Sequence, residues 1–190
     1  MNVTPTKIPG MLILEPRVFR DERGAFFESF QASRYQVAGI DRPFVQDCFS
    51  RSVRGVVRGL HYQLRRPQGK LCSVLEGEVF DVAVDLRRGS PAFGTWVGVG
   101  LSASNGRQVY LPPGLAHGFC VLSDEALFHY KCTEFYAPQS ERTLLWNDPH
   151  LAIAWPVEQP ILSAKDLQGV SWNETPRFDE RESTLHDYLL

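Results

Sequence analysis

The clearest hydrophobic pattern in the chain runs over residues 79–86, where every second side chain is large and apolar. The positions between them carry two carboxylates, Asp81 and Asp85, among small residues. Alternation with a period of two predicts a β-strand with one fully apolar face. An apolar face opposite a charged face is typical of the wall of a β-sandwich that holds a polar ligand. A strand whose charged face simply meets water is the alternative that this pattern leaves open.

Similar short runs recur along the chain about every 10 residues, and nearly every connection carries Gly, Pro, Asn or Asp. Further strands are predicted over residues 11–14, 25–30, 44–50, 56–63, 71–75, 96–101, 108–111, 117–122 and 126–136. A short helix is predicted over residues 31–38, ended by Gly39, and the charged tail, residues 170–190, is expected to be peripheral or helical. This arrangement predicts an all-β sandwich or barrel with short peripheral helices.

Length and composition narrow the class of protein. The 190 residues suit a single domain, residues 1–190, with a sizeable core, and 43% of them are hydrophobic. The net charge of −2 gives no basic excess for nucleic acid or an anionic membrane, although a local cluster could still bind a small anion. No apolar run approaches the roughly 20 residues of a membrane helix, and no secretory signal is visible. Scattered cysteines without a Cys-x-x-Cys pair then favour reduced thiols in a cytoplasm.

One spacing pattern is more specific. Gly106, Pro112, Gly114 and His117 match G-x5-P-x-G-x2-H, the second motif of the cupin superfamily. The resemblance implies a double-stranded β-helix of the jelly-roll kind. Metal-binding cupins carry His-x-His in their first motif, whereas the counterpart here is His61-Tyr-Gln, without the second histidine. Fewer than three good ligands hold a divalent metal weakly, so no metal is predicted and a metal oxygenase becomes a minor alternative.

A set of blocks that follow one another in order and spacing resembles a single family. The blocks lie at residues 45–52, 55–63, 68–71, 77–86, 89–91, 116–119, 130–131, 146–149 and 162–166. Together they resemble the dTDP-4-dehydrorhamnose 3,5-epimerases, metal-free enzymes with a cupin fold that act on sugar nucleotides. The likeness covers a core of about residues 8–168, and so many ordered blocks are far more specific than any single motif.

The resemblance implies a reaction on a 4-keto-6-deoxyhexose carried on dTDP. Such an enzyme inverts C3 and C5 of dTDP-4-dehydro-6-deoxy-D-glucose to give dTDP-4-dehydro-L-rhamnose. The C4 carbonyl acidifies the hydrogens on both neighbouring carbons, so a base can remove a proton from one face and an acid can return one to the other. The site therefore needs a base, an opposed acid and a positive group near the developing oxyanion, but no redox cofactor or metal.

Four residues match the family's proton-transfer positions. His61 is implied to be the base, since a histidine is neutral and basic near cellular pH. Asp166 is implied to orient the His61 ring and to stabilise its imidazolium form. Lys70 would stabilise the enolate oxygen, and Tyr130 would donate the proton on the opposite face.

Other positions match those at which the family binds the nucleotide or the sugar. They are Arg23, Phe26, Glu28, Gln46, Asp47, Cys48, Arg58, Glu141 and Lys165. His117 is implied to contact the keto-sugar and Tyr136 to stack on thymine; because Tyr130 and Tyr136 share one predicted strand at an even spacing, they are expected on the same face. In the family Arg23 and Glu28 reach into the neighbouring subunit's site, which implies a homodimer with strand exchange.

Cys48 departs from the family, which usually has asparagine at this position. A thiol is a much weaker hydrogen-bonding group than an amide, so the identity of the substrate is left open here. One alternative is an epimerase that inverts only C3 or only C5, or that uses another nucleotide. The other is a non-catalytic cupin that binds a sugar or a metal, although such a module needs no opposed acid and base.

Overall fold

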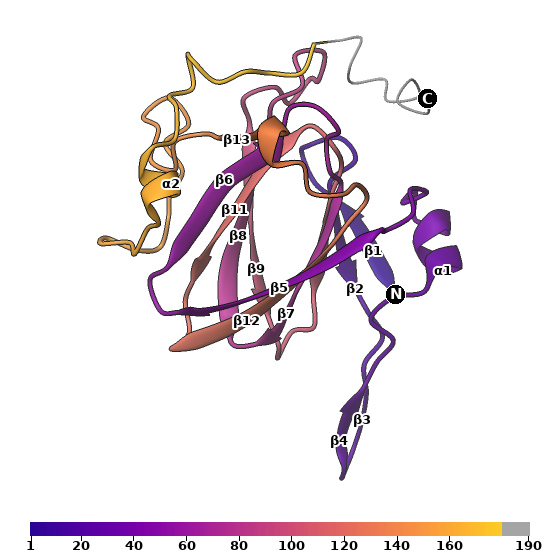
Figure 1. The fold of residues 1–190 in the computed structure, drawn as a ribbon. Coiled ribbons are helices and arrows are strands. Elements are labelled where there is room, and N and C mark those ends of the chain that lie inside the picture. Colours follow the sequence, from indigo (N-terminus) through magenta and orange to yellow (C-terminus); the bar gives the residue numbers. More distant parts are fainter. Residues whose placement is uncertain (180–190) are drawn as a thin grey trace.

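The computed structural model describes residues 1–179, which form two facing antiparallel sheets (Figure 1). The first sheet has the order β1 (Asn2–Pro5), β2 (Leu12–Glu15), β10 (Gln108–Leu111), β7 (Lys70–Glu76), β12 (Glu125–Cys132) and β5 (Gln46–Val53). The second has the order β13 (Glu141–Thr143), β6 (Val57–Gln63), β11 (Leu115–Val121), β8 (Glu78–Asp85) and β9 (Trp96–Ser102). The predicted cupin-type, all-β jelly roll is confirmed.

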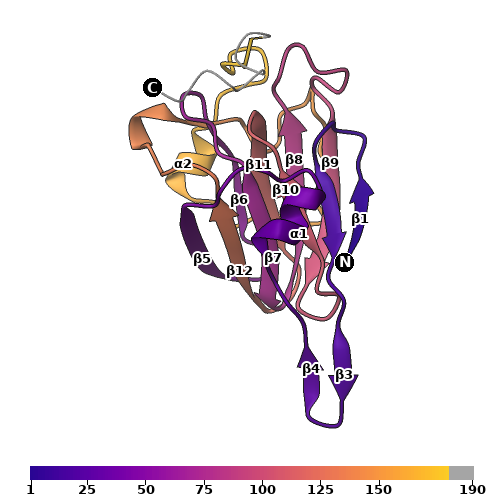
Figure 2. The same cartoon turned by 90° about the vertical axis from the view of Figure 1, so that its right-hand side faces the viewer.

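The remaining elements are small and peripheral. A separate hairpin consists of β3 (Phe19–Asp21) and β4 (Gly24–Phe26), and it extends away from the two sheets (Figures 1 and 2). The helices are α1 (Ala32–Val37), α2 (Ala164–Leu167) and the single 3-10 turn η1 (Pro138–Ser140). No helix within residues 1–179 has the length and apolar character needed to cross a membrane.

Strand β8 is buried on both faces. Val79 and Ala83 point between the sheets and join the main core, whereas Val82 and Val84 pack in a second cluster on the outer side of the five-stranded sheet. Asp81 lies on the inner face and is 0% exposed. The alternative in which the charged face of this strand meets water is therefore wrong.

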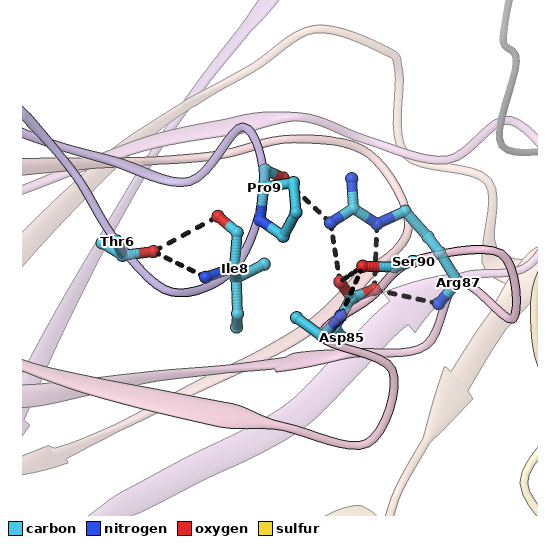
Figure 3. A network of polar contacts seen from close by, with 7 residues as sticks. Thr6, Ile8, Pro9, Asp85, Arg87 and Ser90 are labelled. Carbon is cyan, nitrogen blue, oxygen red and sulfur yellow. Dashed lines mark hydrogen bonds and ion pairs between the residues drawn. The ribbon is translucent and has the colours of Figure 1, made fainter.

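The other carboxylate of β8, Asp85, is held by a local network (Figure 3). Its oxygens accept hydrogen bonds from the Arg87 backbone N, from Nε of Arg87 at 2.9 Å and from the Ser90 hydroxyl at 2.6 Å. Arg87 also donates to the carbonyl oxygen of Pro9 at 2.9 Å. Every charge in this buried cluster is paired, so Asp85 fastens the N-terminal segment to β8 and takes a structural role.

The outer side of the five-stranded sheet is covered by the chain that follows β13. Trp172 and Phe178 are 6% and 2% exposed and pack there with Leu60, Tyr62 and Leu86. The helical alternative for the tail is therefore wrong for residues 170–179, which contain no helix and pack on the outer side of the sheet, and residues 180–190 lie outside the described part of the chain. The large aromatic side chains of this segment, rather than its charges, decide where it lies.

Two predicted strands are shorter than expected. The strand predicted over residues 25–30 ends at Phe26, at the end of the hairpin away from its turn. The strand predicted over residues 126–136 ends at Cys132, where Thr133 exchanges hydrogen bonds with Gly69 and the chain leaves the sheet. Tyr136 consequently lies outside β12, so the prediction that it shares a strand face with Tyr130 is wrong.

Candidate active site

Two histidines lie opposite each other on neighbouring strands of the five-stranded sheet. His61 on β6 pairs in register with His117 on β11. The strands approach closely at Gly59, where a Cβ would lie 2.5 Å from the Cα of Gly118, and the φ of Gly59 is +124°. Only glycine meets both demands, and this contact positions the two histidines toward the space between the sheets.

His61 forms a dyad with Asp166, 105 residues later in the sequence. Nε2 of His61 lies 2.5 Å from Oδ1 of Asp166, which is 3% exposed. Asp166 sits in the first turn of α2, where Ser163 caps the helix and donates to Oδ2 at 2.7 Å. Burial tends to raise the pKa of Asp166, but the hydrogen bonds from His61 and Ser163 outweigh it and hold that pKa below its usual value. The carboxylate is thus ionised and ready to orient the imidazole.

Tyr130 and Lys70 lie on the opposite sheet. Tyr130 belongs to β12 and Lys70 to the neighbouring β7, and Nζ of Lys70 lies 5.7 Å from the centre of the Tyr130 ring. Burial, reinforced by Cys48, raises the pKa of Tyr130, so the phenol keeps its proton at neutral pH. A histidine on one wall and a tyrosine with a lysine on the other form an arrangement suited to moving protons on two faces of a bound molecule.

His117 has a carboxylate partner of its own. Its Nε2 lies 2.8 Å from Oδ2 of Asp81, and both side chains are buried. Burial is the main cause that lowers the pKa of His117, so the ring is neutral. Cys72 lies beside this pair, 3.8 Å from Nε2. Within residues 1–179 this trio is the group of side chains whose donor atoms are close enough to hold a metal ion, but a metal would have to displace the bond between Asp81 and His117.

The predicted nucleotide-binding residues gather beyond the end of β12. Oε1 of Gln46 accepts from the Tyr136 backbone N at 2.9 Å, and Nε2 of Gln46 donates to Cys48 Sγ at 3.1 Å. The Tyr136 hydroxyl donates to Glu141 at 2.8 Å, and Lys165 forms an ion pair with the same carboxylate. These residues form one connected cluster whose half-exposed Tyr136 ring is open to a planar ligand.

Two other predicted residues lie apart from that cluster. Arg58 on β6 donates from Nε to the Ser52 hydroxyl at 3.1 Å, which leaves the rest of its guanidinium available. Asp47 follows Gln46 on β5 and therefore points to the outer face of the sheet, where it forms an ion pair with Lys131 at 2.8 Å. Asp47 therefore lies on the opposite face of the sheet from Gln46 and Cys48.

The residues in and just after the hairpin also lie away from the His61–Asp166 dyad, because the hairpin extends away from β6 and α2 (Figure 1). Arg23 lies in the β3–β4 turn and pairs with Asp21, while the Phe26 side chain stands free with 73% of its surface exposed. Glu28 forms an exposed ion pair with Arg34 at 3.0 Å. The hairpin leaves the sheets and carries Arg23 and Phe26 away from the body of the molecule (Figure 2).

Two residues that contact the candidate site residues were not predicted from the sequence. Asp81 was noticed as a carboxylate in an alternating strand, but nothing in the sequence pointed to its partner. Ser163 caps α2 and bonds Asp166, and the spacing Ser-x-x-Asp before a short helix is a local signal that could have revealed it.

The fold and the side chains together define the class: a cupin-type β-sandwich with the His61–Asp166 pair on one wall and Tyr130 beside Lys70 on the other. The model of the dTDP-4-dehydrorhamnose 3,5-epimerase family matches residues 5–174. The chain belongs to this family.

Individual relatives agree with this assignment. The chain is 56% identical over 180 residues to a dTDP-4-dehydrorhamnose 3,5-epimerase from Pseudomonas aeruginosa, covering 94% of this chain and 99% of that protein. It is also 56% identical to a dTDP-6-deoxy-D-glucose-3,5-epimerase from Legionella pneumophila, solved with dTDP-4-keto-L-rhamnose. That match has a TM-score of 0.89 and covers 92% of this chain and 94% of the other. A dTDP-4-dehydrorhamnose 3-epimerase from Streptomyces niveus is 43% identical over 169 residues, covering 87% and 81% of the two chains.

Proposed function

We propose that this chain inverts C3 and C5 of dTDP-4-dehydro-6-deoxy-D-glucose and so produces dTDP-4-dehydro-L-rhamnose. The observation that carries the proposal is the His61–Asp166 dyad on one wall and Tyr130 on the other. The relatives with the highest identity given above bear the name of a 3,5-epimerase, which supports inversion at both carbons.

His61 acts as the base through Nδ1. Its Nε2 faces Asp166, and an ionised carboxylate only accepts hydrogen bonds, so Nε2 carries the ring proton and Nδ1 holds the lone pair. When Nδ1 takes a proton from C3 or C5, the imidazolium that forms lies beside the negative charge of Asp166. Asp166 therefore stabilises the protonated ring without touching the sugar.

Lys70 and Tyr130 complete the reaction from the other sheet. Removal of the proton moves negative charge onto the C4 oxygen, and the ammonium group of Lys70 stabilises that enolate. Tyr130 then donates its phenolic proton to the opposite face of the same carbon, which inverts the configuration. Because both C3 and C5 flank the carbonyl, the same set of residues can serve each in turn.

Inversion of C3 alone is the second candidate, and a specific observation favours it. The relative from Streptomyces niveus is named a 3-epimerase, and in this chain Cys48 pairs in register with Tyr130 where the family usually has asparagine. A changed neighbour of the proton donor could alter which carbon is reprotonated.

Incubation with dTDP-4-dehydro-6-deoxy-D-glucose in heavy water separates the two candidates. Each inverted carbon must take its new hydrogen from solvent, so NMR should show deuterium at both C3 and C5. Deuterium at C3 alone would replace the first proposal by the second, and no deuterium at either carbon would refute both.

We also infer a homodimer in which each β3–β4 hairpin enters the partner's site. Arg23 pairs with Asp21 in the hairpin turn and Phe26 is 73% exposed, while the outer face of the six-stranded sheet leaves Phe49 and Leu75 exposed beside a shallow groove. Exposed apolar side chains gathered on one sheet face mark an interaction surface. A second copy of the chain would cover that face and receive the hairpin.

Mixing two inactive variants tests the hairpin exchange. Arg23→Ala and His61→Asn should each lose most activity, but a mixed dimer has one site with neither change. After subunit exchange at equal amounts, about a quarter of wild-type activity should return. If activity stays at the level of the separate variants, Arg23 serves its own subunit.

We further infer a cytoplasmic enzyme, because all four cysteines are free thiols.

A further inference from the structure

The Asp81–His117 pair has a feature that its burial alone does not explain. Asp81 is 0% exposed, and its Oδ2 is bonded to Nε2 of His117, but its Oδ1 is buried and has no hydrogen-bond partner among residues 1–179. A buried carboxylate usually satisfies both oxygens, as Asp85 does four residues later on the same strand. Asp81 thus keeps a costly arrangement, in which one oxygen bonds His117 and the other is buried without a partner in the described part of the chain.

The chemistry of that contact fixes the tautomer of His117. An ionised carboxylate offers only lone pairs, so Nε2 must carry the hydrogen that bonds Asp81. The ring is neutral, because burial lowers the pKa of His117, and its single ring hydrogen is already used. Nδ1 therefore holds a lone pair. Among the described residues, the polar contacts of the His117 side chain with Asp81 and Cys72 both use Nε2, which leaves Nδ1 for a ligand. His117 pairs in register with His61 on the neighbouring antiparallel strand, so the two side chains project from the same face of the sheet.

We infer that Asp81 is a positioning residue that keeps His117 in the Nε2–H form, so that Nδ1 accepts a hydrogen bond from a ring hydroxyl of the sugar. The inference rests on the proposed epimerase function. It gives Lys70 and His117 different hydrogen-bonding roles toward the sugar, one as a donor and one as an acceptor. Lys70 can only donate, and it faces the carbonyl oxygen, whereas His117 can only accept, and it faces a hydroxyl. A sugar turned the other way would set acceptor against acceptor, so this division selects one orientation of the ring.

The first test needs no substitution of Asp81. Wild-type enzyme labelled with ¹⁵N-histidine is examined by NMR at neutral pH, and the His117 signals are assigned by their loss in His117→Gln. A protonated Nε2 and a bare Nδ1 are expected, and addition of the nucleotide sugar should shift the Nδ1 signal whereas dTDP alone should not. A proton on Nδ1 would mean that Asp81 is the donor and would overturn the inference.

The second test compares two matched substitutions. Asp81→Asn and Asp85→Asn replace buried carboxylates of one strand by the same amide, but only the first touches His117. Asp81→Asn should raise KM for the nucleotide sugar about two- to tenfold, the net value of one hydrogen bond between neutral groups, and leave the inhibition constant of dTDP unchanged. Asp85→Asn should lower the melting temperature while leaving KM near the wild-type value.

The outcomes are distinguishable from a failure of the epimerase proposal. If Asp81→Asn changes KM and the dTDP inhibition constant by the same factor, the residue is merely structural and the inference falls. An unchanged KM with an unchanged His117 tautomer overturns it as well. Deuterium exchange by the wild-type enzyme in the same buffer reports the proposed function separately, since that reaction uses Asp81 only indirectly.

Discussion

Asp166→Asn is the substitution whose effect on catalysis follows most directly from the structure. The carboxylate accepts from His61 at 2.5 Å and from Gly59 N at 3.3 Å through Oδ1, and from Ser163 at 2.7 Å through Oδ2. An asparagine can keep its oxygen toward His61, because the Ser163 hydroxyl can accept from the amide nitrogen. The geometry then survives, but the negative charge is lost.

The expected loss falls on kcat. Without the carboxylate, the imidazolium that forms on His61 is no longer stabilised, and an amide turned the other way would impose the wrong tautomer. A buried aspartate that orients a catalytic histidine is worth about 10²- to 10⁴-fold in kcat, or about 3–5 kcal/mol of transition-state stabilisation. KM should change little, because Asp166 lies behind the ring and meets no part of the sugar.

Product formation followed by NMR gives kcat and KM for the variant. Ser163→Ala is the matched control, since it removes one hydrogen bond from Asp166 but leaves its charge, and its kcat should stay within about tenfold of wild type. A kcat for Asp166→Asn that equals the Ser163→Ala value would refute the claim that the Asp166 carboxylate assists proton removal by His61.

Three further predictions concern stability and binding. Burial raises the pKa of Asp166, but its hydrogen bonds lower that pKa by more, so the folded-state pKa lies below the unfolded one. The ionised carboxylate therefore stabilises the fold above pH about 4, and this stabilisation is lost as the pH falls through the folded-state pKa. The urea midpoints of wild type and Asp166→Asn should accordingly converge in acid. Cys48→Asn should lower KM about two- to tenfold at an unchanged melting temperature; a lower melting temperature without tighter binding would place Cys48 away from the ligand. Phe178→Ala should cost about 3–5 kcal/mol in urea unfolding because the ring is 2% exposed, and a loss below about 1 kcal/mol would contradict its place in the core.

Much of the fold could be predicted because strand alternation is a local property. The runs at residues 56–63, 71–75 and 78–86 correspond to β6, β7 and β8, since each carries its periodic pattern and its turn residues within a few positions. Where strands end was less predictable. The end of β12 depends on hydrogen bonds between Thr133 and Gly69, which are far apart in the sequence, and for this reason Tyr136 was misplaced.

The candidate site likewise combines residues that could be identified from the sequence with contacts that only the folded chain creates. The family resemblance, which the comparisons confirm, named His61 and Asp166, but no local pattern could bring together residues so far apart; that depends on where α2 docks. The pairing of Asp81 with His117 requires two neighbouring strands in a particular register, which the sequence does not display. The position of Asp47, in contrast, could have been predicted from the sequence. Alternation already separates it from Gln46 and Cys48, so the strand pattern could have placed it on the outer face.

The opposed base and acid are the central claim, and Tyr130→Phe in heavy water tests it most directly. The variant retains His61, so proton removal should continue and recovered substrate should gain deuterium at C3 with its original configuration. Inverted product should nearly disappear, because the opposite wall lacks its donor. If Tyr130→Phe forms inverted product at close to the wild-type rate, the proton does not come from Tyr130 and the two-wall account of this enzyme is wrong.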